Sequence, residues 1–428
     1  MRNSAFDELE HHVARALDLG DTGAWAELDE HIRGALRWGR VPPTHVWFPG
    51  VTQSRLPTDP ELAIALCGPD GRIREAALAY APGAPALLPL VVIRCADWAE
   101  PVRARARAVL GAELPGLSPE ALGPITAVAL RVAGRGRGNA ASELLVRLLR
   151  EGPEADATAL LGYEDRAVRR LAHRVAVERG LLSPARLATT AATDPDVVVQ
   201  DLCASAAITA AGDTVDETVL APLLGSRTGR VRAAGVTALR RGGRAAEAEP
   251  FLYDRSALVR ACARWTLRQA GTDPLPLYRA ACAAGDRTPH FAPVGLAECG
   301  DRATDVPTLW ALIDHDRPRV RAGAVVGLRL LDAVRPQRLV PLLDDSSRRV
   351  VGETAKALAP RADHLPGEVP SDAPAGVPID TPADTPAGTP GAVPVDVPID
   401  SAGPEPGAWA LRVLRLVLGR NRGRATGA

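Results

Sequence analysis

The chain has 428 residues, and its 51 Lys and Arg residues balance 51 Asp and Glu residues, so the formal net charge is zero. This balance excludes a global electrostatic bias towards nucleic acid or an anionic membrane. The six Cys residues show no Cys-x-x-Cys spacing, which argues against a zinc or thioredoxin-like motif and favours a reducing compartment. The N-terminus lacks the apolar segment of a signal peptide, and the longest apolar run, residues 84–93, is too short to span a bilayer. We therefore expect a cytoplasmic protein.

Residues 1–59 are predicted to form an N-terminal helical cap on the rest of the chain. Apolar residues recur with helical spacing in two successive segments. The two stripes are Phe6, Leu9, Val13 and Leu17, and Trp25, Leu28, Ile32 and Leu36. The prolines Pro42, Pro43, Pro49 and Pro57, with Pro60 directly after them, predict an irregular loop over residues 39–59. Its Trp47 and Phe48 either form an exposed patch for a partner or fold back over the first helices, and the second interpretation is favoured.

A repeat of about 31 residues organises residues 60–365. Its clearest copy, residues 314–328, has a turn rich in Asp, Arg and Pro followed by a helix with an apolar anchor at Val320. The other anchors are Ile73, Val102, Gly136, Val168, Val199, Val231, Val259, Thr288 and Val350, of which Gly136 and Thr288 match least well. A small residue, such as Ala263 or Ala324, follows each anchor after four positions, and Leu or Ala follows after eight. Such columns let neighbouring helices approach to roughly 8–10 Å, so about ten helix pairs are predicted.

Three features of the repeat point to a known family. The second helix begins with a Val-Arg pair, an Asp lies a few residues upstream, and a Pro interrupts the preceding helix. The pairs begin at Val102, Val168, Val231, Val259 and Val320, the acids are Asp97, Asp165, Asp254 and Asp316, and the prolines are Pro222, Pro250, Pro307 and Pro341. The pattern resembles the HEAT repeat, including the phycocyanobilin-lyase HEAT-like type. The resemblance implies an all-α fold, a right-handed α-solenoid of HEAT-like helix pairs, but says little about function because such repeats serve unrelated roles.

Arg follows most of the anchors. These residues either form a row that binds anions or a structural ladder in which each Arg pairs with an upstream acid such as Asp97, Asp165 or Asp254, and the ladder is favoured. The predicted ladder residues are Arg74, Arg103, Arg169, Arg232, Arg260 and Arg321.

The face of the second helices opposite the core is rich in basic residues. Positions two, five, six and nine after each anchor point away from the buried stripe. The basic residues there are Arg107, Arg170, Arg174, Arg240, Arg264, Arg268, Arg329 and Lys356, whereas the acids are Glu75 and Asp201. Because the resemblance implies that second helices line a concave surface, we predict a basic groove that binds partners. The alternative, a solvated face of an Arg-rich chain, is equally open.

The C-terminal part differs in kind. Residues 366–407 are predicted to be a disordered, extended, acidic linker, because Pro recurs at every fourth position from Pro366 to Pro398. Residues 408–428 are predicted to form a short amphipathic helix with a basic tail. Its apolar residues are Trp409, Leu411, Leu414 and Leu418. A helix this short is marginal alone, so it should dock on a protein partner, which is favoured, on the solenoid, or on a membrane.

We find no catalytic constellation: the sequence has no His-x-x-x-His pair, phosphate-binding Gly-rich loop or Gly-x-Ser-x-Gly motif. The sequence therefore favours a non-catalytic scaffold for protein partners, acidic ones among them, without a cofactor or metal. One alternative is a nucleic-acid-binding protein similar to HEAT-like DNA glycosylases. The predicted groove has few aromatic residues, with Trp265 the main exception, which argues against base stacking. Another alternative is a lyase or lyase accessory of the bilin-lyase type, which only the repeat supports.

Overall fold

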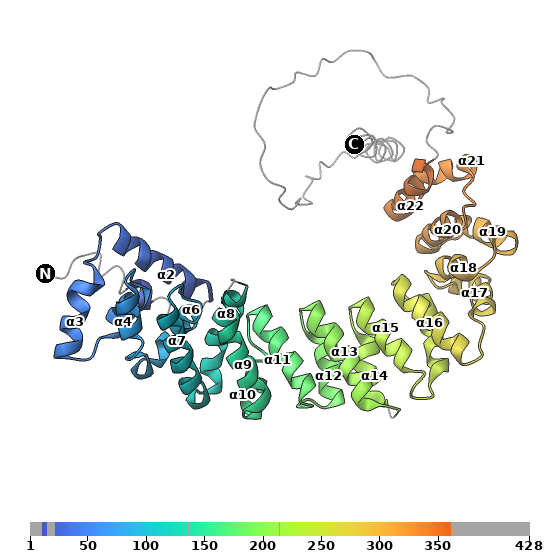
Figure 1. Ribbon diagram of the computed structural model, residues 1–428. Coiled ribbons are helices and arrows are strands. Elements are labelled where there is room, and N and C mark those ends of the chain that lie inside the picture. Colours follow the sequence, from blue (N-terminus) through green and yellow to red (C-terminus); the bar gives the residue numbers. More distant parts are fainter. Residues whose placement is uncertain (1–10, 15–21, 135–136, 214, 361–428) are drawn as a thin grey trace, which may run out of the picture. The chain divides into compact units, whose positions relative to one another are not determined.

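The computed structural model describes residues 11–14, 22–134, 137–213 and 215–360, and within these ranges it contains helices and no strand (Figure 1). The prediction of an all-α fold built from HEAT-like helix pairs is confirmed. The chain divides into two compact units, Met1–Gly242 and Gly243–Ala428. The expected linker at residues 366–407 and the expected C-terminal helix with Trp409, Leu411, Leu414 and Leu418 lie outside the described residues.

The first unit contains two layers of helices. Its α-helices are α2 (Thr22–Arg37), α3 (Thr44–Ser54), α4 (Asp59–Cys67), α5 (Gly71–Ala77), α6 (Leu88–Arg94), α7 (Glu100–Glu113), α8 (Leu122–Ala133), α9 (Asn139–Glu151), α10 (Glu154–Ala159), α11 (Arg166–Glu178), α12 (Pro184–Thr193), α13 (Val197–Ala211), α14 (Glu217–Gly225) and α15 (Gly229–Ala238). The second helices of the pairs, α5, α7, α9, α11, α13 and α15, pack one against the next, and the first helices pack beside them (Figure 1). Short 3-10 turns at Ala81–Gly83, Pro85–Leu87, Leu114–Gly116 and Pro119–Ala121 connect some of these helices.

The second unit continues the same alternation. It contains a 3-10 helix η5 (Ala245–Tyr253) and the helices α16 (Ala257–Gln269), α17 (Pro274–Cys282), α18 (Ala292–Cys299), α19 (Arg302–Ala311), α20 (Pro318–Leu330), α21 (Pro336–Leu339) and α22 (Arg348–Leu358), with 3-10 turns at Gly285–Arg287, Leu312–Asp314 and Val340–Asp344. Helix α20 packs against both α18 and α22.

The predicted columns form the core of both units. Val320, Ala324 and Leu328 are all fully buried, as are Val259 and Ala263. Thr288, one of the two weak anchors, is also fully buried. Small side chains in these columns let the helices pack closely, which is why the period read from the sequence translates into stacked pairs.

The other weak anchor, Gly136, is in the wrong register. In α9 the buried residues are Ala141, Leu145 and Leu149, whereas Ala140 and Leu144 are only half-buried. The stripe is therefore shifted by one residue. The sequence before this helix is rich in Gly and offers no apolar residue to mark the start of the stripe, so the spacing from the neighbouring repeats did not fix its phase.

The N-terminal segment also differs from the expectation. Residues 44–54, predicted to be irregular, form α3, with Pro49 inside the helix. Phe48 is 1% exposed and its ring packs edge-on against Tyr80 at 6.2 Å, so burial of the apolar face outweighs the unfavourable Pro. Helix α2 contacts α4, α6 and α8, and its Trp25, Leu28 and Ile32 are buried.

Two glycines permit close packing against tyrosine rings: Gly123 of α8 faces Tyr163 of the segment before α11, and Gly295 of α18 faces Tyr278 of α17. A Cβ on Gly123 would lie 2.2 Å from the Tyr163 ring, and one on Gly295 would lie 2.1 Å from the Tyr278 ring. The hydroxyl of Tyr278 donates to the Leu252 carbonyl at 2.8 Å. Each tyrosine thus fills the space that the missing side chain leaves.

Candidate functional site

Five of the arginines that follow an anchor bind the turn before their own helix in the same way. The Nη1 atom of each donates to the carbonyl oxygens five and six residues upstream at 2.8–3.2 Å. This geometry is shared by Arg74, Arg103, Arg169, Arg232 and Arg321, while Arg260 makes the bond to Asp254 only. Gln200 takes the same position in its repeat and donates to the Asp194 carbonyl at 2.6 Å. One function of this position is therefore to satisfy backbone carbonyls that the turn leaves open.

The acids upstream of these arginines do not pair as expected. The carboxylates of Asp97, Asp165 and Asp254 accept a hydrogen bond from the backbone N–H two residues further on, at 2.7–2.9 Å. The expectation that each acid binds the Arg that follows it is wrong, because a short Asp side chain reaches its own turn first.

Four of the six ladder arginines meet a carboxylate of the next repeat. Arg74 makes two bonds to Asp97 at 2.8 and 2.9 Å, and Arg321 makes two to Asp345 at 2.8 and 2.9 Å. Arg169 lies 3.3 Å from Asp194, and Arg260 binds Glu298. These pairs therefore connect consecutive repeats, and they leave the arginines neutralised.

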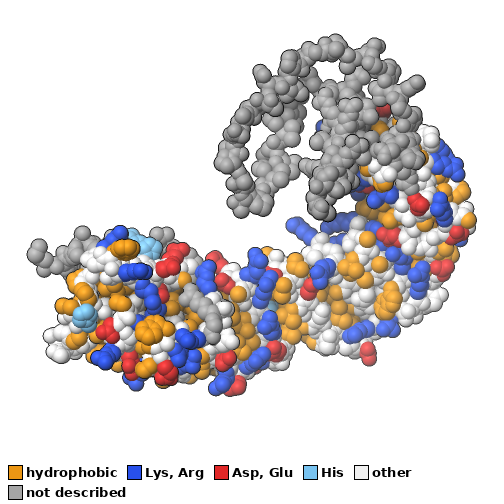
Figure 2. All heavy atoms as spheres, turned by 45° about the horizontal axis from the view of Figure 1, so that its top comes forward, with side chains coloured by type: hydrophobic (Ala, Val, Ile, Leu, Met, Phe, Trp, Pro, Cys, Tyr) orange, Lys and Arg blue, Asp and Glu red, His pale blue; other side chains and the backbone are white. Residues whose placement is uncertain are grey.

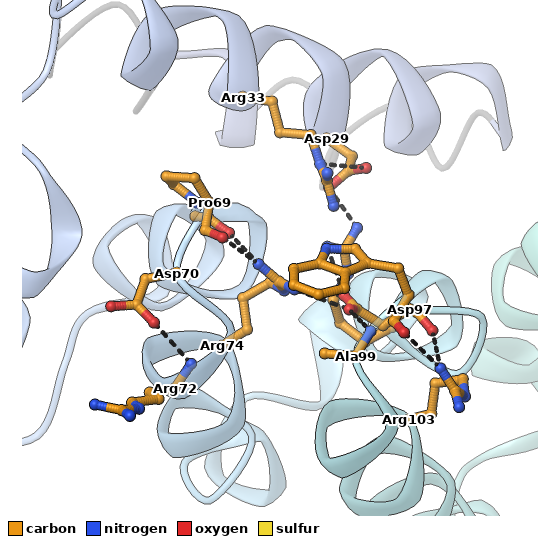
Figure 3. A network of polar contacts seen from close by, with 12 residues as sticks. Asp29, Arg33, Pro69, Asp70, Arg72, Arg74, Asp97, Ala99 and Arg103 are labelled. Atoms are coloured by element: carbon orange, nitrogen blue, oxygen red, sulfur yellow. Dashed lines mark hydrogen bonds and ion pairs between the residues drawn. The ribbon is translucent and has the colours of Figure 1, made fainter.

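Figure 3 shows the most buried of these networks, in the first unit. Arg74 reaches from α5 to the Pro69 carbonyl and to Asp97, and its side chain is 0% exposed. Arg94, 1% exposed, lies 3.4 Å from Asp97 and 2.5 Å from Asp29 of α2. Burial raises the pKa of Asp97, but hydrogen bonds from Arg74 and the Ala99 amide outweigh it and hold the pKa below its ordinary 3.8. Asp97 is thus ionised and paired at neutral pH, which indicates a structural role.

In the first unit, two of the predicted groove residues are paired or half-buried and two are exposed. Arg170 makes two bonds to Asp196 at 2.6 and 3.0 Å, and Arg107 is half-buried, with an Nε atom that has no hydrogen-bond partner among the described residues. Arg174 and Arg240 are exposed.

In the second unit most predicted groove residues have acidic neighbours. Arg264 binds Glu298 at 2.5 Å, Arg329 lies 4.0 Å from Glu353, and Lys356 binds Glu353 at 2.8 Å, whereas Arg268 is exposed. Asp196, Glu298 and Glu353 lie outside the four helical positions used for the prediction, so that analysis missed them. Acidic side chains accordingly lie among basic ones on the face in Figure 2.

A different set of basic residues surrounds a pocket in the second unit. Helices α16, α18, α20 and α22 enclose a volume of about 180 Å³. The basic residues of its lining are Arg255, Arg260, Arg319 and Arg349, and Glu353 and His290 also line it. Phe291 also lines it, and the guanidinium carbons of Arg260 and Arg349 lie 5.6 and 5.8 Å from the centre of its ring. These distances are typical of cation–π contacts.

The arginines of this pocket differ in whether an acidic side chain of the protein already pairs with them. Arg260 is 3% exposed and bound to Glu298. Arg319 and Arg349 are exposed, and neither forms an ion pair with another described residue. Burial and the charges of Arg317, Arg319 and Arg349 lower the pKa of His290 below 6.5, so its imidazole is neutral at pH 7. The pocket therefore holds cationic groups that can take an external anion.

Arg319 and Arg349 are not among the residues predicted from the sequence. Each precedes its anchor by one residue, Val320 or Val350, and the prediction considered only positions after the anchor. The signal was present, since the same offset recurs in two successive repeats. Within the described residues, no group of His, Cys, Asp and Glu is arranged to hold a metal ion, and no helix combines the length and apolarity needed to cross a bilayer.

Comparisons with known proteins give a limited picture. No family model matches the sequence, and no curated protein matches it. Among solved structures, Kap121p is 14% identical with a TM-score of 0.28, and the match covers 83% of this chain and 47% of that one. Kap121p bound to Nup53p also gives 14% identity and 0.28, over 84% and 50%. An engineered protein gives 17% identity and 0.22, over 70% and 87%. The chain spans about half the length of Kap121p, and likenesses this low carry no functional argument.

Proposed function

We propose that the chain is a non-catalytic scaffold that binds acidic segments of partner proteins on the exposed face of its second helices. The observation that supports this most is the pair Arg319 and Arg349, two exposed arginines that no described acid neutralises. Among the ladder arginines, Arg74, Arg260 and Arg321 are poor candidates, because binding a partner would require breaking their bidentate ion pairs with carboxylates. The partner-binding residues are therefore fewer than the groove prediction, and centre on the pocket.

The exposed groove arginines extend this surface within each unit. Arg268 of α16 in the second unit and Arg174 of α11 in the first are exposed on second helices, and Arg240 is exposed in the turn that follows α15. Exposed charges add on-rate and selectivity more than affinity. We assign them to steering an acidic segment, while the pocket arginines hold it.

We further propose that the protein works in a reducing compartment such as the cytoplasm, and that residues 366–428 tether a terminal helix to the array. Support for the compartment comes from the cysteines, all six of which are free thiols. Burial raises the pKa of Cys95, Cys203 and Cys282 to about 12, so these thiols are inert.

Binding of a synthetic peptide rich in Asp and Glu to the full-length protein tests the proposal. The double variant Arg319→Ala and Arg349→Ala should weaken binding about tenfold or more, since charge-assisted hydrogen bonds contribute about 1.5–3 kcal/mol each. Arg348→Ala is the matched control, because Arg348 is an exposed neighbour on the same helix that does not line the pocket. Equal affinity of all three proteins would refute the proposed site.

A further inference from the structure

The pocket of the second unit lies where four helices begin. Arg255 lies just before α16, and His290 and Phe291 just before α18. Arg319 and Arg349 occupy the first turns of α20 and α22. Helix N-termini carry partial positive charge and unpaired N–H groups. The dipoles of these helices therefore act in the same direction as the arginines and favour an anion in the pocket.

The arrangement of charge suits a dianion with several acceptor oxygens. Arg319 and Arg349 line the pocket from different helices, α20 and α22, so two guanidiniums are available to one bound group. The acidic residue of the lining, Glu353, is bound by Lys356 at 2.8 Å, which offsets its repulsion of an anion. A single carboxylate is satisfied by one guanidinium, whereas a phosphate monoester carries about −1.5 to −2 charges and three acceptor oxygens.

Phe291 and Gly323 shape the pocket for such a group. The ring of Phe291 lies beside the guanidiniums of Arg260 and Arg349 and adds no negative charge to the pocket, because it offers only a π face. Gly323 of α20 also lines the pocket, and a Cβ there would lie 2.9 Å from the His290 carbonyl. Close approach of α20 to the start of α18 thus brings Arg319 towards His290.

We propose that this pocket binds the phosphate monoester of a phosphorylated Ser or Thr side chain on a protein partner. The inference rests on the proposed function, and it defines the ligand of that surface as a phosphorylated segment rather than any acidic one. Phosphorylation of the partner would then switch binding on, because the unmodified hydroxyl offers the arginines no charge.

The test compares three labelled peptides of one sequence, carrying phosphoserine, Ser or Glu at the central position, with full-length protein at 0.15 M salt, roughly physiological. We expect the phosphoserine peptide to bind at least tenfold more tightly than the other two. Arg319→Ala and Arg349→Ala should each reduce this affinity at least fivefold, and Arg348→Ala less than twofold. Arg349→Lys should recover only part of the loss, because an ammonium cannot form the bidentate fork.

Other outcomes separate this inference from the proposed function. Equal binding of the phosphoserine and Glu peptides, with both weakened by the pocket variants, would overturn the phosphate assignment and leave the acidic-segment scaffold standing. No effect of either pocket variant on any peptide would overturn both. Stronger competition by a single-stranded oligonucleotide than by the phosphoserine peptide would overturn the inference in favour of nucleic acid. Competition by inorganic phosphate at a concentration similar to that of the peptide would overturn the assignment to a protein partner, because the peptide would then contribute no affinity of its own.

Discussion

At the scale of single residues, arginine side chains occupy two different environments in this chain. Arg74 is fully buried and bound to Asp97 and two carbonyls, whereas Arg349 is exposed beside an aromatic ring. Both lie next to an anchor of the repeat, on opposite sides of it. The difference lies in what each residue meets after folding: Arg74 meets the turn before its own helix, whereas Arg349 lines the pocket.

Replacing Arg74 tests the buried network. Arg74→Ala should lower the free energy of unfolding of the first unit by about 3–5 kcal/mol, because it leaves the buried Asp97 carboxylate without its main partner. Denaturant unfolding followed by circular dichroism measures this loss. Arg72→Ala, an exposed residue on the same helix, should change the free energy by less than about 0.5 kcal/mol. Similar losses in the two variants would show that the network does not stabilise the fold.

The same network predicts a dependence on pH. The folded-state pKa of Asp97 is lowered, mainly by Arg74 acting against burial, so its stabilisation is present above the unfolded pKa and is lost as pH falls through the folded value. Stability should therefore be steady near neutral pH and fall below about pH 4, the region of the ordinary Asp pKa. The difference in unfolding free energy between the parent and Asp97→Asn should shrink over that range. A difference that stays constant from pH 7 to pH 3 would contradict an ionised Asp97.

At the scale of helices, the small column determines how closely pairs pack. Ala263 of α16 and Ala324 of α20 are both 0% exposed. Their helices face other helices through these positions, and interiors are too densely packed to admit extra methylene groups. Glycines at closer contacts, such as Gly295 against Tyr278, follow the same logic.

Enlarging the small column should destabilise the second unit. Ala263→Leu or Ala324→Leu is expected to lower the unfolding free energy by about 1–3 kcal/mol through overpacking. Ala261→Leu, on the exposed face of α16, is the matched control and should have little effect. Thermal melting of the three variants provides the measurement, and parent-like melting of both buried variants would show that the assigned register is wrong.

At the scale of the whole molecule, the acidic segment and the basic surface have opposite charge. Residues 366–407 carry seven acids and no base. At about 3.1 Å per residue, these 42 residues reach about 130 Å when fully extended. A tethered segment of this kind has an effective concentration of about a millimolar. We propose that it competes with acidic partners for the basic surface.

Deleting residues 366–428 should therefore strengthen binding of acidic peptides at low salt. The gain should fade above about 0.3 M salt, since screening weakens contacts between exposed charges. Peptide titrations at several salt concentrations give the comparison. A full-length variant with the seven linker acids changed to Asn or Gln separates charge from length, and should match the truncated protein. Identical low-salt affinities of the parent and truncated proteins would leave the segment as a simple tether.

The sequence by itself determined the helical class, the repeat and most of the buried columns, because the period of apolar and small residues is set locally by helix geometry. It did not determine which residues of α9 are buried, because the Gly-rich sequence around Gly136 gives no apolar periodicity. It also did not determine the helix at Thr44–Ser54, where burial of apolar side chains outweighs the helix-breaking tendency of Pro49. Only the tertiary structure decided which acid meets which arginine, since Arg74 and Asp97, or Arg260 and Glu298, belong to different repeats. For the same reason the pocket was invisible in the sequence: its residues come from four helices and converge only when the pairs stack.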